Sequence, residues 1–391
     1  MKILRIIRSM NPAQGGVVEA INQAALSLNN EKHQMDVLCL DNPNAEWVVG
    51  NNHYTIHALG EGKTAYGFHL SYLFWLWKKS KDYDVVIIDG LWQFLVIGGY
   101  ILKLLKVPYC VFTHGMLDPY FNEDKLKYIK KLPFWFVSER NVIAMSKAVI
   151  FTCQEESKLA SLSFPFYRAT PQIATLGIEA NTSDKGDLSV IFLNEFPVLK
   201  NKRFAVFLSR IHEKKGIDLL ITALGQLKNL PDDFMLAIAG PDSNGLQAKL
   251  TKQIETLGLT ERVVWLGMLK GDIKWGAYHA ADVFVLPSHQ ENFGIVVAEA
   301  LSTATPVLIT NKVNIWREID AAGAGFVEND DVAGVKVLLE RWLSLADADK
   351  QVMSKNASLC YENNFSLEAA VVDLEKALID VVESHREKVH A

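Results

Sequence analysis

Cysteine is scarce in this sequence, which has 391 residues and four cysteines. The four lie far apart, at Cys39, Cys110, Cys153 and Cys360. No pair has the C-x-x-C spacing of a zinc or redox site, so the pattern excludes a disulfide scaffold and indicates small buried thiols in a reducing compartment. Basic charge is not in excess either, because 40 Lys and Arg face 45 Asp and Glu. The resulting net charge of −5 argues against a nucleic-acid partner.

Long apolar runs are also missing. The most apolar stretch, Leu91–Leu102, ends at Lys103, whereas a membrane-spanning helix needs about 20 apolar residues. The N-terminal segment Met1–Arg8 is interrupted by charges and does not have the form of a signal peptide. We therefore expect a cytoplasmic chain, and attachment to the inner face of a membrane stays open.

Hydrophobic residues make up 49% of the chain and charged residues 22%, which is typical of globular domains with buried cores. Short, nearly continuous apolar runs alternate with amphipathic helical patterns, as in parallel sheets whose strands are buried on both faces. The expected strands are 3–7, 36–40, 85–89, 109–113, 148–152, 172–176, 204–209, 234–239, 263–266, 283–287, 306–310 and 325–327. The length and this alternation predict an α/β protein of two doubly wound, Rossmann-like domains.

The alternation pauses in the polar stretch 179–202, which we expect to be irregular and to separate the domains. The N-terminal domain would span residues 1–178 and the C-terminal domain 179–369, with a final helix at about 370–391 packing back on the first domain. Ligands of open α/β sheets bind beyond the carboxyl ends of the strands. Two such domains facing each other would form a cleft lined by residues that follow strands.

The strongest functional signal follows the expected strand 283–287. A polar loop leads to Gly294, which opens a helix carrying Glu299. Backbone N–H groups at a helix start bind anions or hydroxyls, and ionised carboxylates are acceptors suited to sugar hydroxyls. Glu291 and Glu299, at E-x7-E spacing, could hold opposite ends of one hydroxyl-rich ligand. A capped helix with two solvated acids is the alternative.

A second signal is the sequence S-R-x-x-x-x-K-G at Ser209–Gly216, after the first strand of the second domain. Arg210 and Lys215 would lie just beyond the carboxyl end of that strand. A departing diphosphate needs cationic donors, and a bidentate Arg with a Lys point charge supplies them. Either residue alone could equally belong to a solvated basic loop.

Together these segments resemble the retaining glycosyltransferases of group 1, family 4 in the sequence classification, which have the two-domain GT-B architecture. The two motifs agree in order and in their separation of roughly 80 residues. Three further pieces agree in order: Gly15-Gly16 after the first strand, His114-Gly115 after strand 109–113, and Leu176–Glu179 at the end of the first domain. The chain departs from many relatives at 311–318, where they carry a glycine-rich turn.

The resemblance implies a role for each matching residue. Arg210 and Lys215 would neutralise the donor diphosphate, and Glu299 would accept hydrogen bonds from the donor ribose. Glu291 would hold hydroxyls of the transferred sugar, and His114 would support the developing positive charge or relay to the acceptor. The expected catalytic residues are His114, Arg210, Lys215 and Glu291. The expected donor-binding residues are Gly15, Gly16, Arg210, Lys215, Glu291, Asn292, Phe293, Gly294, Ile295 and Glu299.

The activity that the resemblance implies is retaining, metal-independent transfer from a nucleotide-sugar donor to a hydroxyl of a glycan or lipid-linked acceptor, in polysaccharide or glycolipid biosynthesis. No cofactor is expected, and the sugar and base stay open. A phosphorylase or epimerase of the GT-B type is one alternative, although the Glu291–Glu299 spacing disfavours the epimerase. A non-catalytic nucleotide-sugar-binding protein is another, although it would have no reason to retain the full set of charged residues.

No metal site is expected. A metal-dependent transferase would use a D-x-D pair as its Mg²⁺ or Mn²⁺ anchor. Asp82-Tyr83-Asp84 precedes a strand and Asp347-Ala348-Asp349 lies in a polar helical stretch, so neither triplet follows a strand. The sequence contains no zinc spacing, P-loop or G-x-S-x-G motif.

Lysines and aromatic residues alternate in segment 117–137, which has a helical pattern. Its lysines are Lys125, Lys127, Lys130 and Lys131. Such a segment can lie on an anionic membrane or contact a lipid-linked acceptor. Ordinary helix packing with the lysines extended into solvent fits equally well. With the preceding His114–Pro119, the segment also resembles transferases of surface-polysaccharide assembly.

Overall fold

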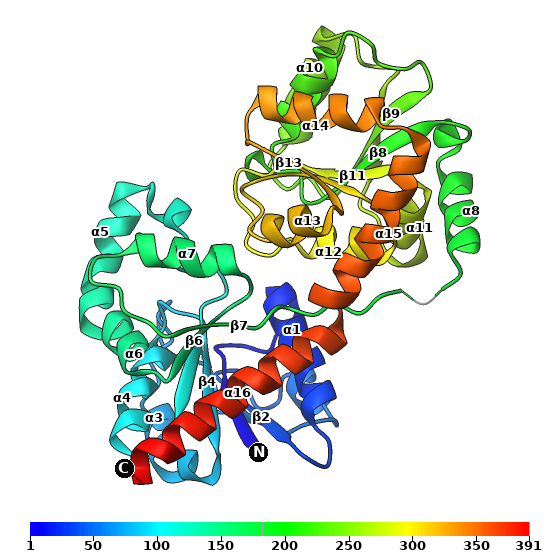
Figure 1. Ribbon diagram of the computed structural model, residues 1–391. Coiled ribbons are helices and arrows are strands. Elements are labelled where there is room, and N and C mark those ends of the chain that lie inside the picture. The colour runs from blue at the N-terminus through cyan, green and yellow to red at the C-terminus, as the bar shows by residue number, and fades with distance from the viewer. Residues whose placement is uncertain (182, 391) are drawn as a thin grey trace. The chain divides into compact units, whose positions relative to one another are not determined.

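The computed structural model describes residues 1–181 and 183–390. It divides into two compact units, of which the first comprises Met1–Gly177 with the segment from Leu367 onward and the second Ile178–Ser366 (Figure 1). Each unit is built on one parallel β-sheet with helices around it. The predicted α/β class with two Rossmann-like domains is therefore confirmed. No helix within the described residues is long and apolar enough to cross a bilayer.

The first unit contains seven strands and eight α-helices among the described residues. The strands are β1 (Lys2–Ile6), β2 (Gln34–Cys39), β3 (Ile56–Ala58), β4 (Val85–Asp89), β5 (Tyr109–Phe112), β6 (Ala148–Phe151) and β7 (Pro171–Ile173). The helices are α1 (Gly16–Leu28), α2 (Glu46–Val49), α3 (Leu70–Lys79), α4 (Gly98–Leu104), α5 (Lys125–Phe134), α6 (Arg140–Met145), α7 (Gln154–Ser163) and α16 (Leu367–His390). The sheet order is β3-β2-β1-β4-β5-β6-β7. Only β3, a three-residue strand at the sheet edge, lacked a predicted counterpart, because it has no apolar run.

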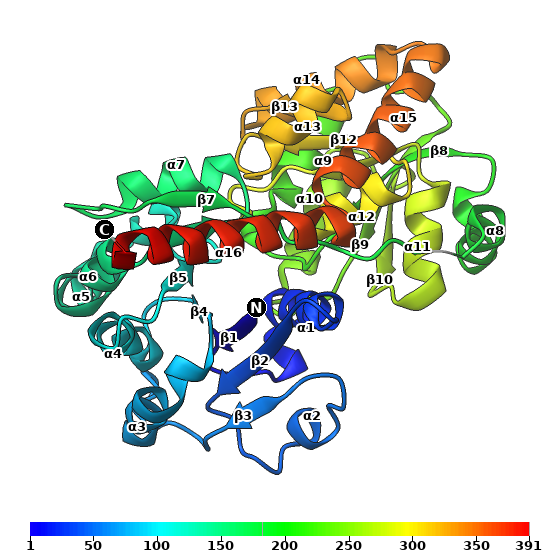
Figure 2. The same cartoon turned by 60° about the horizontal axis from the view of Figure 1, so that its bottom comes forward.

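Alternate residues of the central strands face opposite sides of this sheet, and both sides are buried. Leu4 and Val86 pack with helices α3, α4, α6 and α7, whereas Ile3 and Val85 pack with α1 and α16. Figure 2 shows α16 running along the first unit near β1 and α1, with α3 and α4 on the other side of the strands. The continuous apolar runs in the sequence follow from this double burial.

The second unit contains six strands and eight α-helices among the described residues. The strands are β8 (Arg203–Leu208), β9 (Phe234–Ala239), β10 (Val263–Gly267), β11 (Val283–Leu286), β12 (Val307–Thr310) and β13 (Gly325–Glu328). The helices are α8 (Lys185–Glu195), α9 (Ile217–Gly225), α10 (Leu246–Thr256), α11 (Gly271–Ala280), α12 (Ile295–Ser302), α13 (Trp316–Ala322), α14 (Val332–Ser344) and α15 (Asp347–Asn364). The sheet order is β10-β9-β8-β11-β12-β13, with β8 paired to β9 and β11 in parallel.

The expectation of irregular chain at 179–202 is wrong, because α8 lies within it. Leu188 and Phe192 are buried, and the Phe192 ring stacks on that of Phe204 in β8 at a centroid distance of 6.1 Å. Other apolar residues of this helix, Val190 and Ile191, are exposed. The apolar positions therefore give little helical periodicity, and packing that a local pattern does not reveal stabilises the helix.

Segment 117–137 is helical for most of its length, as predicted. Helix α5 starts after Asp124, whose carboxylate accepts hydrogen bonds from the N–H groups of Leu126 and Lys127. It continues through a π-helical turn, η5 (Trp135–Glu139), into α6.

Candidate active site

His114 lies on a tight turn directly after β5. The Met116 N–H donates to the Thr113 carbonyl over 3.0 Å, and the two central residues have positive φ, 49° at His114 and 77° at Gly115. Glycine adopts this conformation at no steric cost, whereas a histidine there is unusual. A strained residue that persists must be held by its surroundings, and such residues cluster at functional sites.

Glu156 on α7 holds this turn. Its buried carboxylate accepts hydrogen bonds from the Gly115 N–H over 2.6 Å and from the Thr113 hydroxyl over 2.8 Å. The other oxygen accepts from the N–H and the hydroxyl of Thr152, both over 2.7 Å. Four hydrogen bonds satisfy the buried charge and connect the ends of β5 and β6 to α7.

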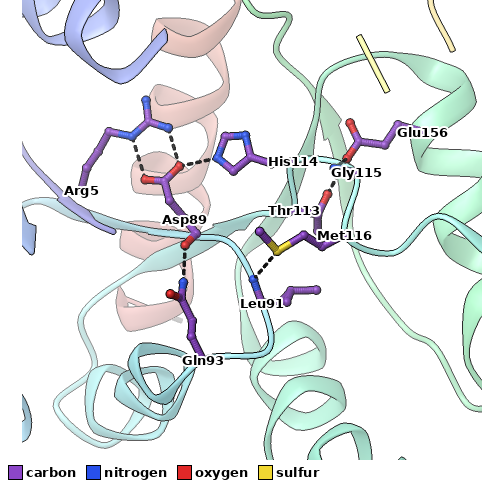
Figure 3. A network of polar contacts seen from close by, with 9 residues as sticks. All are labelled: Arg5, Asp89, Leu91, Gln93, Thr113, His114, Gly115, Met116 and Glu156. Atoms are coloured by element: carbon purple, nitrogen blue, oxygen red, sulfur yellow. Dashed lines mark hydrogen bonds and ion pairs between the residues drawn. The ribbon is translucent and has the colours of Figure 1, made fainter. Parts of the chain in front are cut away.

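The imidazole of His114 is bonded to a buried ion pair (Figure 3). Its Nε2 lies 2.7 Å from Asp89 Oδ1 at the end of β4, and Arg5 of β1 donates to both oxygens of Asp89 over 2.9 and 2.5 Å. Arg5 and Asp89 are each 2% exposed. Burial opposes the Asp89 charge, but Arg5 and then His114 hold the pKa of this carboxyl below its usual value. The Asp89 carboxylate is therefore ionised.

A cavity of about 550 Å³ opens beside this network, at the carboxyl ends of β1, β4 and β5. The strand order reverses between β1 and β4, and such a switch point is the usual ligand site of an open α/β sheet. The polar residues that line the cavity are Arg8, Ser9, Gln14, Asp89, Gln93 and His114. Gly15 and Gly16 form the start of α1, next to Gln14. The first unit thus contains a polar pocket with His114 in its wall.

In the second unit, the two motifs predicted from the sequence meet. The Lys215 ammonium forms an ion pair with Glu291, although 76 positions separate the two residues. Gly216 makes this approach possible, because a Cβ atom there would lie 2.0 Å from the Pro287 carbonyl oxygen. The His289 N–H also donates to the Lys214 carbonyl over 2.8 Å. Arg210, after β8, is exposed.

The remaining predicted residues of the second loop surround the start of α12. Gly294 is the N-cap and Ile295 the first helical residue. The Asn292 side chain accepts a hydrogen bond from Asn314 over 3.4 Å, and the Glu291 carbonyl accepts from the Asn314 N–H over 2.9 Å. Phe293 is 3% exposed and its ring packs edge-on against Phe365. A ligand could therefore contact the Phe293 backbone but not its ring.

Glu299 already has two protein partners. Lys274 of α11 lies 2.8 Å from Oε1, and the Tyr278 hydroxyl donates to Oε2 over 2.9 Å. Burial raises the pKa of Tyr278 well above its ordinary value, with the Glu299 charge adding to the effect. A carboxylate has about four lone-pair positions, so Glu299 can still accept from a ligand diol.

The aspartates of the two D-x-D triplets contact other protein groups or lie in a helix. Asp84 accepts from the Lys2 N–H over 2.8 Å, and Asp82 faces Lys79 at 3.8 Å. Asp347 and Asp349 lie in the first turn of α15. Among the side chains that the structure describes, no group of three or more His, Cys, Asp or Glu could hold a metal ion.

Sequence reasoning missed Arg5, Asp89, Glu156 and Lys274. Arg5 and Asp89 did leave a signal, because each is a charge within an apolar run of its strand, and a buried charge requires a partner. Glu156 and Lys274 lie on helices that carry other charged residues, so the sequence does not distinguish them from ordinary solvent-exposed positions.

Comparison with known proteins agrees with this arrangement. Residues 192–359 match the family described as glycosyl transferases group 1, and residues 15–170 match the glycosyl transferase 4-like domain. These two matches together span most of the chain. The chain belongs to the group 1, family 4 glycosyltransferases and has their GT-B fold.

Individual relatives are distant. A D-inositol 3-phosphate glycosyltransferase of Salinispora tropica is 28% identical over 217 residues, which are 53% of this chain and 44% of that protein. The chain thus spans less than half the length of this relative. An uncharacterized glycosyltransferase of Methanocaldococcus jannaschii is 25% identical over 76% of this chain and 77% of its own length. The crystal structure of Anabaena HepE in complex with UDP has a TM-score of 0.77 at 19% identity, covering 97% of this chain and 100% of that one. At this identity the likeness shows the fold alone.

Proposed function

We propose that the chain is a retaining glycosyltransferase of the hexosyltransferase type, which moves a sugar from a nucleotide-sugar donor to a hydroxyl of a glycan or lipid-linked acceptor. The observation that carries the proposal is the ion pair between Lys215 and Glu291, which joins the two family motifs in one site. Retention, metal independence and a place in polysaccharide or glycolipid biosynthesis rest on the family resemblance.

The second unit would bind the donor. Arg210 and Lys215 would stabilise the negative charge that develops on the leaving diphosphate, the electrostatic role otherwise given to a metal ion. The start of α12 would offer N–H groups to the same charge, and Glu299 would accept from the ribose hydroxyls. Because HepE is named in complex with UDP, uridine donors are the first to test.

The first unit would bind the acceptor in the cavity beside His114. Its lining combines a cation, amides, a hydroxyl and the imidazole, which suits a ligand rich in hydroxyl groups. In the front-face mechanism that the family implies, the leaving diphosphate would help to take the proton from the attacking hydroxyl.

Transfer is tested with the purified full chain, a panel of UDP, GDP, ADP and dTDP sugars, and glycan and lipid-linked acceptors. Donors that bind should raise the unfolding temperature according to their occupancy. The product should carry the sugar with the anomeric configuration of the donor. Inverted product, or a sugar phosphate formed only when phosphate is added, would contradict the proposal, and the latter would indicate a phosphorylase.

We further propose peripheral contact with an anionic membrane at the cytoplasmic face. Helices α3, α4, α6 and α5 follow one another along one side of the first unit (Figure 2). On α3, Leu70, Phe74 and Trp77 are 56%, 70% and 53% exposed and share one helical stripe. On α5, Leu126 and Ile129 are 72% and 60% exposed.

Lysines accompany these apolar residues. Lys125, Lys127 and Lys130 on α5 are exposed, as are Lys78 and Lys79 at the end of α3. We call these lysines and the five exposed apolar residues the apolar–lysine surface. Apolar side chains flanked by cations fit the boundary between anionic head groups and acyl chains, and a lipid-linked acceptor would be found there.

A further inference from the structure

We propose that Arg5 and Asp89 are positioning residues that hold the proton of the His114 imidazole on Nε2, so that Nδ1 is the nitrogen left to accept from a substrate hydroxyl. The consequence of this tautomer for catalysis rests on the proposed function. The tautomer itself is a property of the first unit and does not depend on that function.

The hydrogen-bond geometry assigns the proton. Asp89 is ionised and can only accept, so the 2.7 Å contact with His114 requires a hydrogen on Nε2. In a neutral imidazole the other nitrogen then carries a lone pair. Nδ1 of His114 is buried and has no hydrogen-bond partner among the described residues. Buried polar atoms are nearly always paired, and a hydroxyl of a bound substrate would supply the missing donor.

Arg5 neutralises the charge of the Asp89 carboxylate. A carboxylate alone beside a histidine favours the imidazolium form. Here the guanidinium makes two hydrogen bonds to the same carboxylate and cannot lose its proton. The buried pair is therefore neutral overall, and a second proton on the His114 ring would add a net positive charge beside two residues that are each 2% exposed.

Other ionisable groups lie beside this network. Arg8, whose guanidinium is always charged, lines the same cavity and adds a further positive charge. Burial raises the pKa of the Cys110 thiol to about 12, so it is neutral. The Glu156 charge is satisfied by Thr113, Gly115 and Thr152. An imidazolium would repel the positive charge that develops at the reacting carbon, and its second N–H would block the acceptor lone pair of Nδ1.

The ring plane is fixed as well as the proton. The imidazole stacks on the Phe112 ring, with centroids 4.2 Å apart and planes at 15° to each other. The Arg5 guanidinium lies 5.7 Å from the centroid of the same Phe112 ring. Together with the Glu156 contacts to the turn, these contacts leave the ring a single orientation.

The direct test is the tautomer of His114 in the full-length protein. Long-range ¹H–¹⁵N NMR correlations of histidine-labelled protein distinguish the two neutral tautomers from the imidazolium, and the His114→Gln variant identifies the signals. In the neutral ring we expect a protonated Nε2 and an unprotonated Nδ1. A neutral ring with its proton on Nδ1 overturns the inference.

Variants test the cause. Arg5→Met removes the two hydrogen bonds that hold the Asp89 carboxylate, so we expect the His114 signals to lose the single Nε2–H tautomer. Asp89→Asn should remove the preference for a proton on Nε2, so that part of the protein has it on Nδ1. It should lower kcat by about 10²-fold, with little change in the donor KM. Glu139→Gln is the matched control, since it removes another buried carboxylate of the first unit, one with hydrogen bonds from Ser138 and the backbone, and should leave the tautomer unchanged.

Folding of each variant is checked by its unfolding temperature and by nucleoside diphosphate binding. The wild-type spectrum needs no variant, so the inference stays testable if Arg5→Met fails to fold. An unchanged tautomer in folded Asp89→Asn overturns the positioning role. If the wild type shows the expected tautomer but no transfer activity, the proposed function alone is contradicted. If it transfers sugar but shows the other tautomer, this inference alone is contradicted.

Discussion

Lys274 and Glu299 form an ion pair in the second unit, with Nζ 2.8 Å from Oε1, although 25 positions separate them. Their side chains are 23% and 13% exposed, so water screens the pair only in part. The pair and the Tyr278 hydroxyl hold the carboxylate in one orientation before any ligand arrives. Such preorganisation lowers the entropic cost of binding.

Glu299→Gln should weaken binding of the donor nucleotide. A hydrogen bond to a charged acceptor contributes about 1.5–3 kcal/mol, which corresponds to a dissociation constant for the nucleoside diphosphate raised about 10- to 100-fold. Calorimetric titration measures the change. Glu340→Gln, an exposed acid paired with Lys336 on α14, is the control and should bind as the wild type does. Equal affinities in both variants would remove Glu299 from the donor site.

Arg210→Ala should reduce transfer by about 10²–10³-fold, because under the proposed function the leaving diphosphate loses a cationic donor. Lys215→Ala should do the same and also leave Glu291 without its partner. Steady-state kinetics with a saturating acceptor measures both. Lys252→Ala, an exposed lysine on α10, should keep the wild-type rate. Wild-type turnover in the Arg210 and Lys215 variants would exclude them from the mechanism.

Chelation should leave transfer intact if, as proposed, Arg210 and Lys215 take the electrostatic role of a metal. The measurement is the initial rate in excess EDTA, compared with the rate after Mg²⁺ or Mn²⁺ is added. Loss of activity that either ion restores would contradict metal independence. Asp84→Asn and Asp347→Asn would then show whether a D-x-D triplet is involved.

Replacing Lys125, Lys127 and Lys130 by Gln should release the protein from anionic vesicles. Each lysine near such a surface contributes about 1 kcal/mol, so the partition coefficient should fall about 100-fold at low salt. Lys131 is left in place because its ammonium lies 5.1 Å from the centroid of a Trp92 ring. Vesicle co-sedimentation at two salt concentrations measures the effect, which should shrink as salt screens the charges.

The matched control changes Lys228, Lys249 and Lys252 of the second unit, which are exposed and outside the apolar–lysine surface. It removes the same charge and should bind vesicles as the wild type does. Equal losses in both variants would mean that net charge, and not this surface, governs binding. Equally poor binding of the wild type to neutral and anionic vesicles would indicate a soluble acceptor.

Glu139→Gln should stabilise the protein at neutral pH. Burial raises the pKa of Glu139 to about 6 from an ordinary value of 4.5, against hydrogen bonds from Ser138 and the backbone that lower it. Between these values the folded state binds more protons than the unfolded state, so stability falls as pH rises. The contribution is complete below 4.5 and lost above about 6, a difference of about 2 kcal/mol.

Unfolding temperatures of the wild type and Glu139→Gln from pH 4 to 8 measure this effect. The two curves should converge at low pH and separate above pH 6, with the variant higher. Glu123→Gln, an exposed acid near the start of α5, should follow the wild type throughout. A constant difference across the whole range would show that Glu139 does not titrate in this window.

The sheet strands were largely predictable from local composition. A strand buried on both faces has to be apolar at nearly every position, as Val85–Ile88 illustrates, so it stands out in the sequence. Strand β3 and helix α8 were missed for the complementary reason. Each is stabilised by contacts with a neighbouring element, and its own residues show too little periodicity to indicate the structure.

The motif residues of the second unit were predictable because the family resemblance links Arg210, Lys215, Glu291 and Glu299 in sequence order. Which atoms meet depends on strand order, which no local pattern contains. Asp89 comes to His114 because β4 and β5 are neighbours, and Arg5 comes to Asp89 because β1 lies on the other side of β4. Parallel strands bring their carboxyl ends to one edge of the sheet. Arg5 and Asp89, 84 positions apart, thereby form one buried hydrogen-bonded group. Because electrostatic interactions are stronger in a buried environment than in water, this group can orient the His114 imidazole.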